Sequence, residues 1–187
     1  LDGHAVITRP GAASRIGEID STADGLAGSF QVRRIERGHL DGGDVLRIGR
    51  RVYIGLSTRT DAKGIASLAD IASPLGYEVI RAELRDCLHL KTGATFAGAD
   101  AAGTPVLLYD LRSVDAAQFS DVEPFAVDEP AAANCVRAGD RLIMPAGNPH
   151  TVARLRERGF NVVEIDVSEL QKAESGVTCM SLLDERP

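Results

Sequence analysis

The chain has 187 residues, a length that suggests one domain able to bury roughly two thirds of its unfolded surface. Its hydrophobic fraction of 44% and charged fraction of 26% are typical of a globular protein. The net charge is -6 with both signs mixed along the chain, 4% of the residues are aromatic, and Trp is absent. This composition argues against nucleic acid or an anionic membrane as a partner.

The cysteine content indicates the compartment. Cys87, Cys135 and Cys179 are too few, and odd in number, for a disulfide framework, so we expect a reducing, cytoplasmic environment. No apolar stretch reaches the roughly 18 residues of a membrane helix, and no charged and apolar leader opens the chain. We therefore expect neither a membrane span nor a signal peptide. The start at Leu1 rather than Met indicates a processed, trimmed or partial sequence.

The first half of the chain predicts short strands, turns and one helix. A β-like run occupies 5–8, and two further runs at 45–48 and 51–56 are joined by a tight turn. Apolar residues at helical spacing over 65–75 then predict a helix, and a strand follows at 77–80. The order is therefore hairpin, helix, strand.

The second half repeats the hairpins. Runs at 94–97 and 106–109 flank a connection rich in Gly, Ala and Asp. Runs at 134–137 and 141–144 flank another turn. A helix then occupies 149–158.

The signals for this last helix are specific. Asn148 is a good N-cap with Pro149 at N1, Gly159 ends the helix, and a strand follows at 160–165. The unit of hairpin, helix and strand thus recurs about four times. Its turn glycines fall about 40 to 50 residues apart: Gly3, Gly49, Gly98 and Gly139.

Repeated small β-rich units that share a core close radially as a propeller or stack as an array. The run at 5–8 has no incoming partner in the sequence, and an unpaired strand edge is a liability. We therefore expect a segment upstream of Leu1, with a frayed start as the alternative. Residues 1–187 are taken as a single α/β domain that is incomplete at its N-terminus.

Two residues are candidates for nucleophilic and acid/base chemistry. Cys179 lies in an apolar, strand-like run, where a cysteine is commonly a small buried hydrophobe but can also be an activated thiolate. His89 lies between two leucines and is either a satisfied core residue or a general acid/base held by a carboxylate.

Asp41 and Asp44 are candidates for that carboxylate, although Asp-Gly-Gly-Asp is also an ordinary turn. Arg15 and Arg59 can hold a substrate carboxylate bidentately or simply be solvated. No Cys/His set has zinc-like spacing and no phosphate-binding loop occurs, so we expect no metal. The residues by themselves indicate an α/β repeat domain.

A set of motifs carries a resemblance. It comprises Ile7-Thr8-Arg9-Pro10-Gly11-Ala12-Ala13-Ser14-Arg15, Leu40-Asp41-Gly42-Gly43-Asp44-Val45-Leu46, Gly55-Leu56-Ser57-Thr58-Arg59-Thr60, Leu88-His89-Leu90-Lys91, Ala132-Ala133-Asn134-Cys135, and Ser168-Glu169-Leu170 through Thr178-Cys179. With these motifs in family order and spacing, the sequence resembles the dimethylarginine dimethylaminohydrolases of the amidinotransferase/arginine deiminase superfamily.

The resemblance implies a five-bladed α/β propeller, the pentein fold, with the active site in its central channel and about four blades in this chain. Family members begin some tens of residues earlier, with an acidic segment whose carboxylates bind the substrate guanidinium. Asp121-Val122-Glu123-Pro124-Phe125 is acidic but out of place for that role. We expect the missing segment upstream.

The resemblance also implies roles for single residues. Cys179 matches the nucleophile, His89 the catalytic acid/base, and Asp41 the carboxylate that orients His89. The remaining matched residues are taken as substrate-binding: Arg15 and Arg59 for the α-carboxylate, Glu174 beside the nucleophile, and Asp44.

The implied reaction converts N-omega,N-omega-dimethyl-L-arginine, or a methylarginine, to L-citrulline and dimethylamine. Cys179 attacks the guanidinium carbon, His89 protonates the departing amine, and a thiouronium forms on sulfur. His89 then deprotonates the water that releases citrulline. No metal or organic cofactor is required, and the expected partner is a small guanidino substrate.

Three alternatives stay open. Arginine deiminases use the same residues on unmethylated arginine, although an inserted helical region expected there is not seen. Amidinotransferases differ in the acceptor of the amidino group. A non-catalytic binding remnant of the same fold is the alternative outside the enzymes. The oligomeric state is not indicated, and a homodimer is compatible with the sequence.

Overall fold

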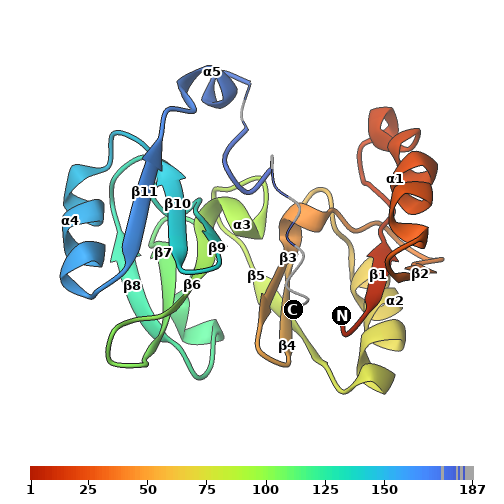
Figure 1. Cartoon of the computed structure of the whole chain (residues 1–187). Helices are drawn as coiled ribbons and strands as arrows, with labels where there is room; N and C mark the ends of the chain where they lie inside the picture. Colours follow the sequence, from red (N-terminus) through yellow and green to blue (C-terminus); the bar gives the residue numbers. More distant parts are fainter. Residues whose placement is uncertain (174, 180, 182, 184–187) are drawn as a thin grey trace. The chain divides into compact units, whose positions relative to one another are not determined.

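The computed structural model describes residues 1–173, 175–179, 181 and 183. They belong to two units, Leu1–Glu83 (unit 1) and Leu84–Glu185 (unit 2), each of which has its own sheets and core (Figure 1). Unit 1 contains β1 (His4–Ile7), α1 (Glu18–Ala27), β2 (Gln31–Arg34), β3 (Val45–Ile48), β4 (Arg51–Leu56), α2 (Ala62–Ala72) and β5 (Glu78–Glu83), with short 3₁₀ turns η1 (Ala13–Arg15), η2 (Gly42–Asp44) and η3 (Ser73–Leu75).

Unit 2 has the larger number of strands. It contains α3 (Leu90–Gly93), β6 (Ala94–Ala99), β7 (Pro105–Asp110), η4 (Ala116–Gln118), β8 (Glu123–Val127), β9 (Val136–Ala138), β10 (Arg141–Pro145), α4 (Pro149–Glu157), β11 (Asn161–Ile165) and α5 (Ser168–Gln171).

The predicted repeat is confirmed in the strand pairing. In three sheets an antiparallel hairpin is followed by a third strand parallel to the second, in the orders β3-β4-β5, β6-β7-β8 and β9-β10-β11. A helix makes the parallel crossover from β4 to β5 and from β10 to β11. Such a crossover is required because a tight turn cannot join parallel strands.

Two details of the repeat differ from the sequence prediction. The connection from β7 to β8 contains only the short η4 turn instead of an α-helix. Gly98 lies within β6 at a register shift rather than in the hairpin turn, which uses Gly103 at φ 82°. Gly98 has φ 95°, a backbone conformation that residues with a Cβ rarely adopt, and a Cβ there would also lie 2.0 Å from the Arg137 guanidinium.

The first strand has a partner that follows it in the chain, while the incoming hairpin strand that the sequence analysis expects upstream is not among the described residues. β1 pairs in parallel with β2, from His4 opposite Gln31 to Ile7 opposite Arg34, and α1 provides the crossover. The sequence patterns missed β2 because its four residues, Gln-Val-Arg-Arg, are mostly polar and exposed.

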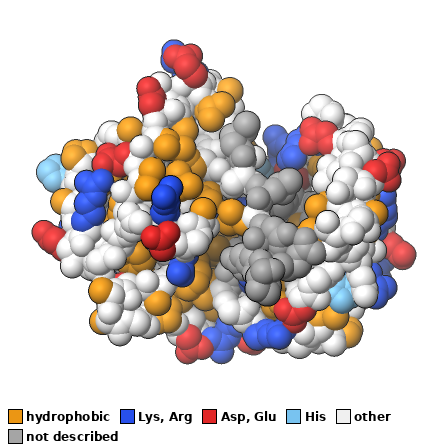
Figure 2. Space-filling model, in the orientation of Figure 1, with side chains coloured by type: hydrophobic (Ala, Val, Ile, Leu, Met, Phe, Trp, Pro, Cys, Tyr) orange, Lys and Arg blue, Asp and Glu red, His pale blue; other side chains and the backbone are white. Residues whose placement is uncertain are grey.

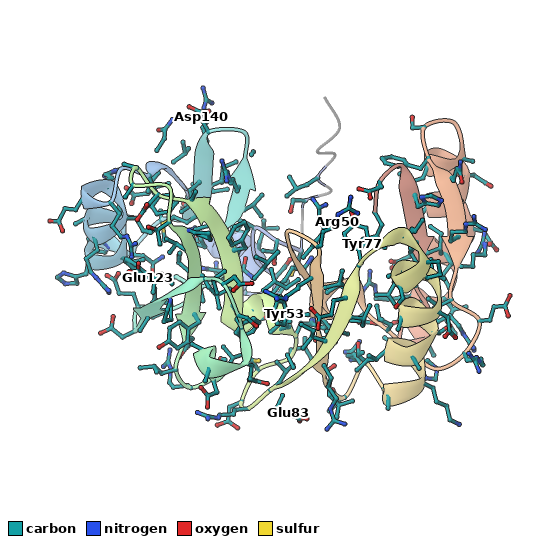
Figure 3. All side chains as sticks on the ribbon, turned by 90° about the horizontal axis from the view of Figure 1, so that it is seen from below. Arg50, Tyr53, Tyr77, Glu83, Glu123 and Asp140 are labelled. Carbon is teal, nitrogen blue, oxygen red and sulfur yellow. The ribbon has the colours of Figure 1, made fainter. Side chains whose placement is uncertain are left out.

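A cluster of polar side chains connects the segment before β1 to the β3-β4 turn and to Tyr77. The Arg50 guanidinium lies 4.8 Å from the centre of the Tyr77 ring, and Tyr77 Oη donates to Asp2 Oδ1 at 2.8 Å (Figure 3). Arg50 also forms an ion pair with Asp2. These contacts join the hairpin turn of β3-β4 to Asp2, two residues before β1.

The core of unit 2 is shared between its two sheets and α4. Leu108 of β7, Met144 of β10 and Leu155 of α4 are each fully buried in one cluster. Their burial contributes roughly 1.5–3 kcal/mol for each side chain. Each small sheet is stable because its apolar face lies against the other.

The start of α4 lies where the sequence predicts it but is capped differently. The Asn148 side chain makes no cap hydrogen bond and donates to Pro145 O at 2.9 Å. The Glu129 carboxylate instead accepts from the His150 and Thr151 backbone N–H groups, at 3.1 and 2.6 Å. A carboxylate suits this position because it meets the positive end of the helix dipole.

Among the described residues, no helix is both long and apolar enough to cross a membrane. On the face that Figure 2 shows, Lys and Arg side chains are interspersed with Asp and Glu side chains. The mixed charge of the sequence is therefore also mixed in space.

We predict that Asp100 makes unit 2 sensitive to acid. Asp100 Oδ2 accepts from Arg158 Nη2 at 2.6 Å, and its Oδ1 accepts from the Thr104 and Ala102 backbone N–H groups. The Arg158 side chain, followed by these N–H groups, holds the pKa of Asp100 below its ordinary value of 3.8. The stabilisation is therefore complete above pH 4 and is lost as the pH falls through the lowered pKa.

Asp100→Asn should lower the thermal unfolding midpoint at pH 7 and make it less dependent on pH below 4. Asp140→Asn is the control, because Asp140 is exposed and accepts one hydrogen bond from Asn161. Equal midpoints for Asp100→Asn and the parent chain at pH 7 would contradict this role.

Candidate active site

Asp41 is held in unit 1 by the backbone around it. Its side chain is 1% exposed, and Oδ1 accepts from the Gly11 N–H at 2.9 Å. Arg15 Nη1 lies 3.7 Å from the other carboxylate oxygen. The structure thus brings together two sequence candidates, a buried carboxylate and a half-exposed guanidinium.

Asp44 is fully buried and holds the loop after β4. Its Oδ2 accepts from Ser57 Oγ at 2.7 Å and from Thr60 Oγ1 at 2.6 Å. Thr60 Oγ1 in turn accepts from the Asp41 N–H at 3.0 Å. These bonds favour a supporting role for Asp44 over direct contact with a substrate.

Arg59 lies in the same loop as Ser57 and Thr60. Its backbone N–H donates to Ser57 Oγ at 3.0 Å, and a Cβ at Gly11 would lie 2.6 Å from its carbonyl oxygen. Gly11 is therefore required for the close approach of two loops. The Arg59 side chain is partly buried. A guanidinium of this kind carries a planar set of donors that suits a carboxylate.

His89 lies in unit 2 at the N-cap of α3. Its backbone oxygen accepts from the Thr92 N–H at 3.0 Å, and its side chain is only partly buried. The acid/base role of His89 therefore stays a prediction beside the alternative of a satisfied core residue. A cavity of about 580 Å³ lies beside this segment, and its lining includes Leu88, Thr92, Asp110, Arg112 and Glu129.

Cys179 is exposed in a turn, not buried in a strand. Its backbone N–H donates to Gly176 O at 3.1 Å. Two residues earlier, Val177 is buried in an apolar cluster with Val136 and Val167. The apolar pattern around Cys179 therefore marks an anchored turn that presents the thiol to solvent.

Asn134 connects the segments that carry His89 and Cys179. Its Oδ1 accepts from the Thr178 N–H at 3.1 Å, and its Nδ2 donates to Thr178 Oγ1 at 3.0 Å and to Lys91 O at 3.3 Å. The sequence motif contained Asn134, but no role was inferred for it. The available signal was a polar residue within a run of small apolar ones.

The remaining thiols have different surroundings. Cys135 is fully buried, and this burial raises its pKa to about 12. Cys87 is partly buried, and its Sγ lies 3.9 Å from Ser113 O. Burial leaves Cys135 protonated and out of reach, whereas Cys179 is accessible.

The sequence candidates thus fall into two sets. Unit 1 holds Arg15, Asp41, Asp44 and Arg59, and unit 2 holds His89 and Cys179. Glu174 lies outside the described residues. In the described ranges, no group of three or more His, Cys, Asp or Glu side chains is arranged to hold a metal ion.

We predict that iodoacetamide distinguishes the cysteines. In the native protein at pH 8, Cys179 should be alkylated at least ~10³-fold faster than Cys135, whose thiolate fraction is about 10⁻⁴. Mass spectrometry of the digested protein resolves the two sites. In strong denaturant both should react at similar rates. Native labelling of Cys135 as fast as Cys179 would contradict this picture.

Comparison with known proteins places these sites in a family context. The arginine deiminase family model matches residues 26–102. The N(G),N(G)-dimethylarginine dimethylaminohydrolase of Pseudomonas aeruginosa is 37% identical over 95% of this chain and 70% of its own length. The solved structure of a cysteine-to-serine mutant of the enzyme from Pseudomonas aeruginosa, complexed with citrulline, superposes with a TM-score of 0.88 at 34% identity, over 96% of this chain and 71% of that one.

A more distant structure shares the fold. The N-terminal domain of ArgZ, an arginine dihydrolase from cyanobacteria, has a TM-score of 0.79 at 26% identity, over 97% of this chain and 71% of that one. These neighbours confirm the predicted pentein fold. The extent and identity of the matches show that the chain belongs to the dimethylarginine dimethylaminohydrolase family.

Proposed function

We propose that the protein hydrolyses N-omega,N-omega-dimethyl-L-arginine, or a methylarginine, to L-citrulline and dimethylamine. The observation that carries the proposal is the exposed turn of Cys179, which Asn134 joins to the segment of His89. A nucleophile and an acid/base group on connected, anchored segments suit covalent catalysis at a guanidinium carbon.

The proposed first step breaks one C–N bond. The Cys179 thiolate donates its electron pair to the guanidinium carbon, and His89 in its protonated form gives a proton to the departing dimethylamine. The product on sulfur is a thiouronium. In the second step His89 takes a proton from water, whose oxygen attacks the same carbon, and the thiolate leaves as citrulline forms.

The residues of unit 1 support the binding of an amino acid substrate. Arg59 has a guanidinium that suits an α-carboxylate, and we assign Arg15 to the same carboxylate. Asp41 is buried and accepts a hydrogen bond from the Gly11 backbone N–H, and these contacts fix the orientation of its carboxylate. Its role in orienting His89, and that of Glu174 beside the nucleophile, rest on the family resemblance.

Deimination of arginine is the second candidate. The match of residues 26–102 to the arginine deiminase model and the likeness to the ArgZ arginine dihydrolase favour it. Both reactions release citrulline, and they differ in the amine that leaves. Dimethylamine from a methylated substrate distinguishes the first function from ammonia release.

Four further assignments are proposals of the same kind. Cys87, Cys135 and Cys179 form no disulfide in the described part of the chain, which supports a reducing, cytoplasmic location. The mixed surface charge supports a small-molecule partner over nucleic acid. A homodimer, and a single domain over 1–187, stay predictions.

Citrulline release from asymmetric dimethylarginine and from arginine tests the proposal in the full-length protein. We expect turnover of the methylated substrate, and a loss on the order of 10³-fold or more in Cys179→Ser, because the serine hydroxyl is a far weaker nucleophile. Cys87→Ser is the matched thiol control and should retain activity. Full activity in Cys179→Ser would remove it as the nucleophile, and preference for arginine would favour the second candidate.

A substitution in unit 1 tests substrate binding. Arg59→Lys keeps the charge but loses the planar fork of donors, so KM should rise roughly 10-fold with a smaller change in kcat. Arg37→Lys is the control, since exposed Arg37 pairs with Asp70 at 2.6 Å. An unchanged KM in Arg59→Lys would exclude carboxylate binding by this residue.

A further inference from the structure

We propose that Asn134 is a positioning residue that sets the Cys179 turn in place relative to the His89 segment. The inference rests on the proposed function for its catalytic meaning. Asn134 contacts neither catalytic side chain in the proposed mechanism. It acts through Thr178, the residue before Cys179, and through Lys91, two residues after His89.

The hydrogen bonds define the orientation of the Asn134 amide. Oδ1 faces the Thr178 N–H, which can only donate, and Nδ2 faces the Lys91 carbonyl, which can only accept. If the amide were reversed, its NH2 group would face the Thr178 N–H and its oxygen would face the Lys91 carbonyl oxygen, so neither hydrogen bond could form. Both Nδ2 hydrogens have acceptors, because the second bond goes to Thr178 Oγ1 at 3.0 Å.

The backbone around Asn134 is anchored by a tight turn and by buried neighbours. Its side chain is 4% exposed, and its backbone N–H donates at 3.0 Å to Ala131 O, in a tight turn where Ala131 has φ 59°. The next two residues, Cys135 and Val136, are buried in apolar clusters. Because the Asn134 amide is held in place, its hydrogen bonds also restrain the positions of Thr178 and Lys91.

Gly176 lets the Cys179 segment approach this amide. A Cβ at Gly176 would lie 2.7 Å from Asn134 Oδ1, closer than real Cβ atoms come. Beyond the amide, Val177 anchors this segment in its apolar cluster. That contact is not directional, whereas two hydrogen bonds between Thr178 and the planar Asn134 amide fix both the position and the orientation of the segment.

Substitutions at Asn134 separate positioning from packing. Asn134→Ala leaves the Thr178 N–H and the Lys91 carbonyl without their partner. Asn134→Asp keeps the shape and the bond from the Thr178 N–H, but turns a carboxylate oxygen toward the Lys91 carbonyl. Both variants should loosen the turn that holds Cys179.

The control is a second buried asparagine of unit 2. Asn148 is 1% exposed and its Nδ2 donates to Pro145 O at 2.9 Å, on the segment before α4. Asn148→Ala removes a buried amide of the same size away from the Cys179 turn. It should lower the thermal midpoint without changing catalysis.

Four quantities are measured in the full-length protein: kcat and KM for asymmetric dimethylarginine, the iodoacetamide alkylation rate of Cys179 between pH 6 and 9, and the thermal midpoint. In Asn134→Ala and Asn134→Asp we expect kcat to fall roughly 100-fold with little change in KM, because small misplacements of a reacting group have this effect. Alkylation of Cys179 at pH 7 should slow several-fold, because in the proposed function His89 activates the thiol and a loosened turn no longer holds the thiol in position for it.

Two variants of Thr178 cover the case in which the Asn134 variants do not fold. Thr178→Val removes the hydroxyl that accepts from Asn134 Nδ2, and Thr178→Ser keeps it. We expect Thr178→Val to reduce kcat by roughly 10-fold and Thr178→Ser to restore most of it. Equal kcat in Thr178→Val, Thr178→Ser and the parent chain would overturn the proposal.

The readouts also distinguish this proposal from the proposed function. If Asn134→Ala lowers only the thermal midpoint, as Asn148→Ala does, and leaves kcat and alkylation unchanged, Asn134 is merely structural and the inference is wrong. If the parent protein turns over neither substrate but the Asn134 variants still slow alkylation of Cys179, the proposed function fails while the positioning role stands.

Discussion

Each sheet of this protein is too small to bury its apolar face by itself, and this constraint explains the arrangement of unit 2. Its cluster combines Leu108 from one sheet, Leu142 and Met144 from the other, and Leu155 from α4. In the same unit, Asn134 lies two residues before β9, whose Val136 is buried, and His89 lies directly before α3, whose Leu90 is fully buried.

Buried polar side chains then connect the segments that the core has brought close. Asp44 joins Ser57 and Thr60 in unit 1, and Asn134 joins Lys91 and Thr178 in unit 2. A buried polar group is costly unless its hydrogen bonds are satisfied, so each arrangement tolerates few alternatives. Within each unit, directional hydrogen bonds therefore hold the candidate site residues in place.

The three cysteines show how burial decides chemical availability. Cys135 and Cys179 both follow polar residues in short motifs, and both belong to unit 2. Burial raises the pKa of Cys135 to about 12, while the turn at Cys179 leaves its thiol exposed. The chemical difference arises from surroundings and not from residue type.

The sequence by itself determined the hairpins and the two crossover helices, because strand alternation, turn glycines and helix-end residues are local signals. The resemblance of its motifs to a known family, and not these local signals, indicated the family and the candidate residues Cys179, His89, Asp41, Arg15 and Arg59. Patterns failed where local signals were weak, as for the polar strand β2 and the helix-free connection at η4. Only the tertiary structure decided that Cys179 is exposed, that Glu129 caps α4, and that Asn134 joins two segments 43 and 44 positions away. These features depend on groups that are distant in sequence and meet only when the shared core forms.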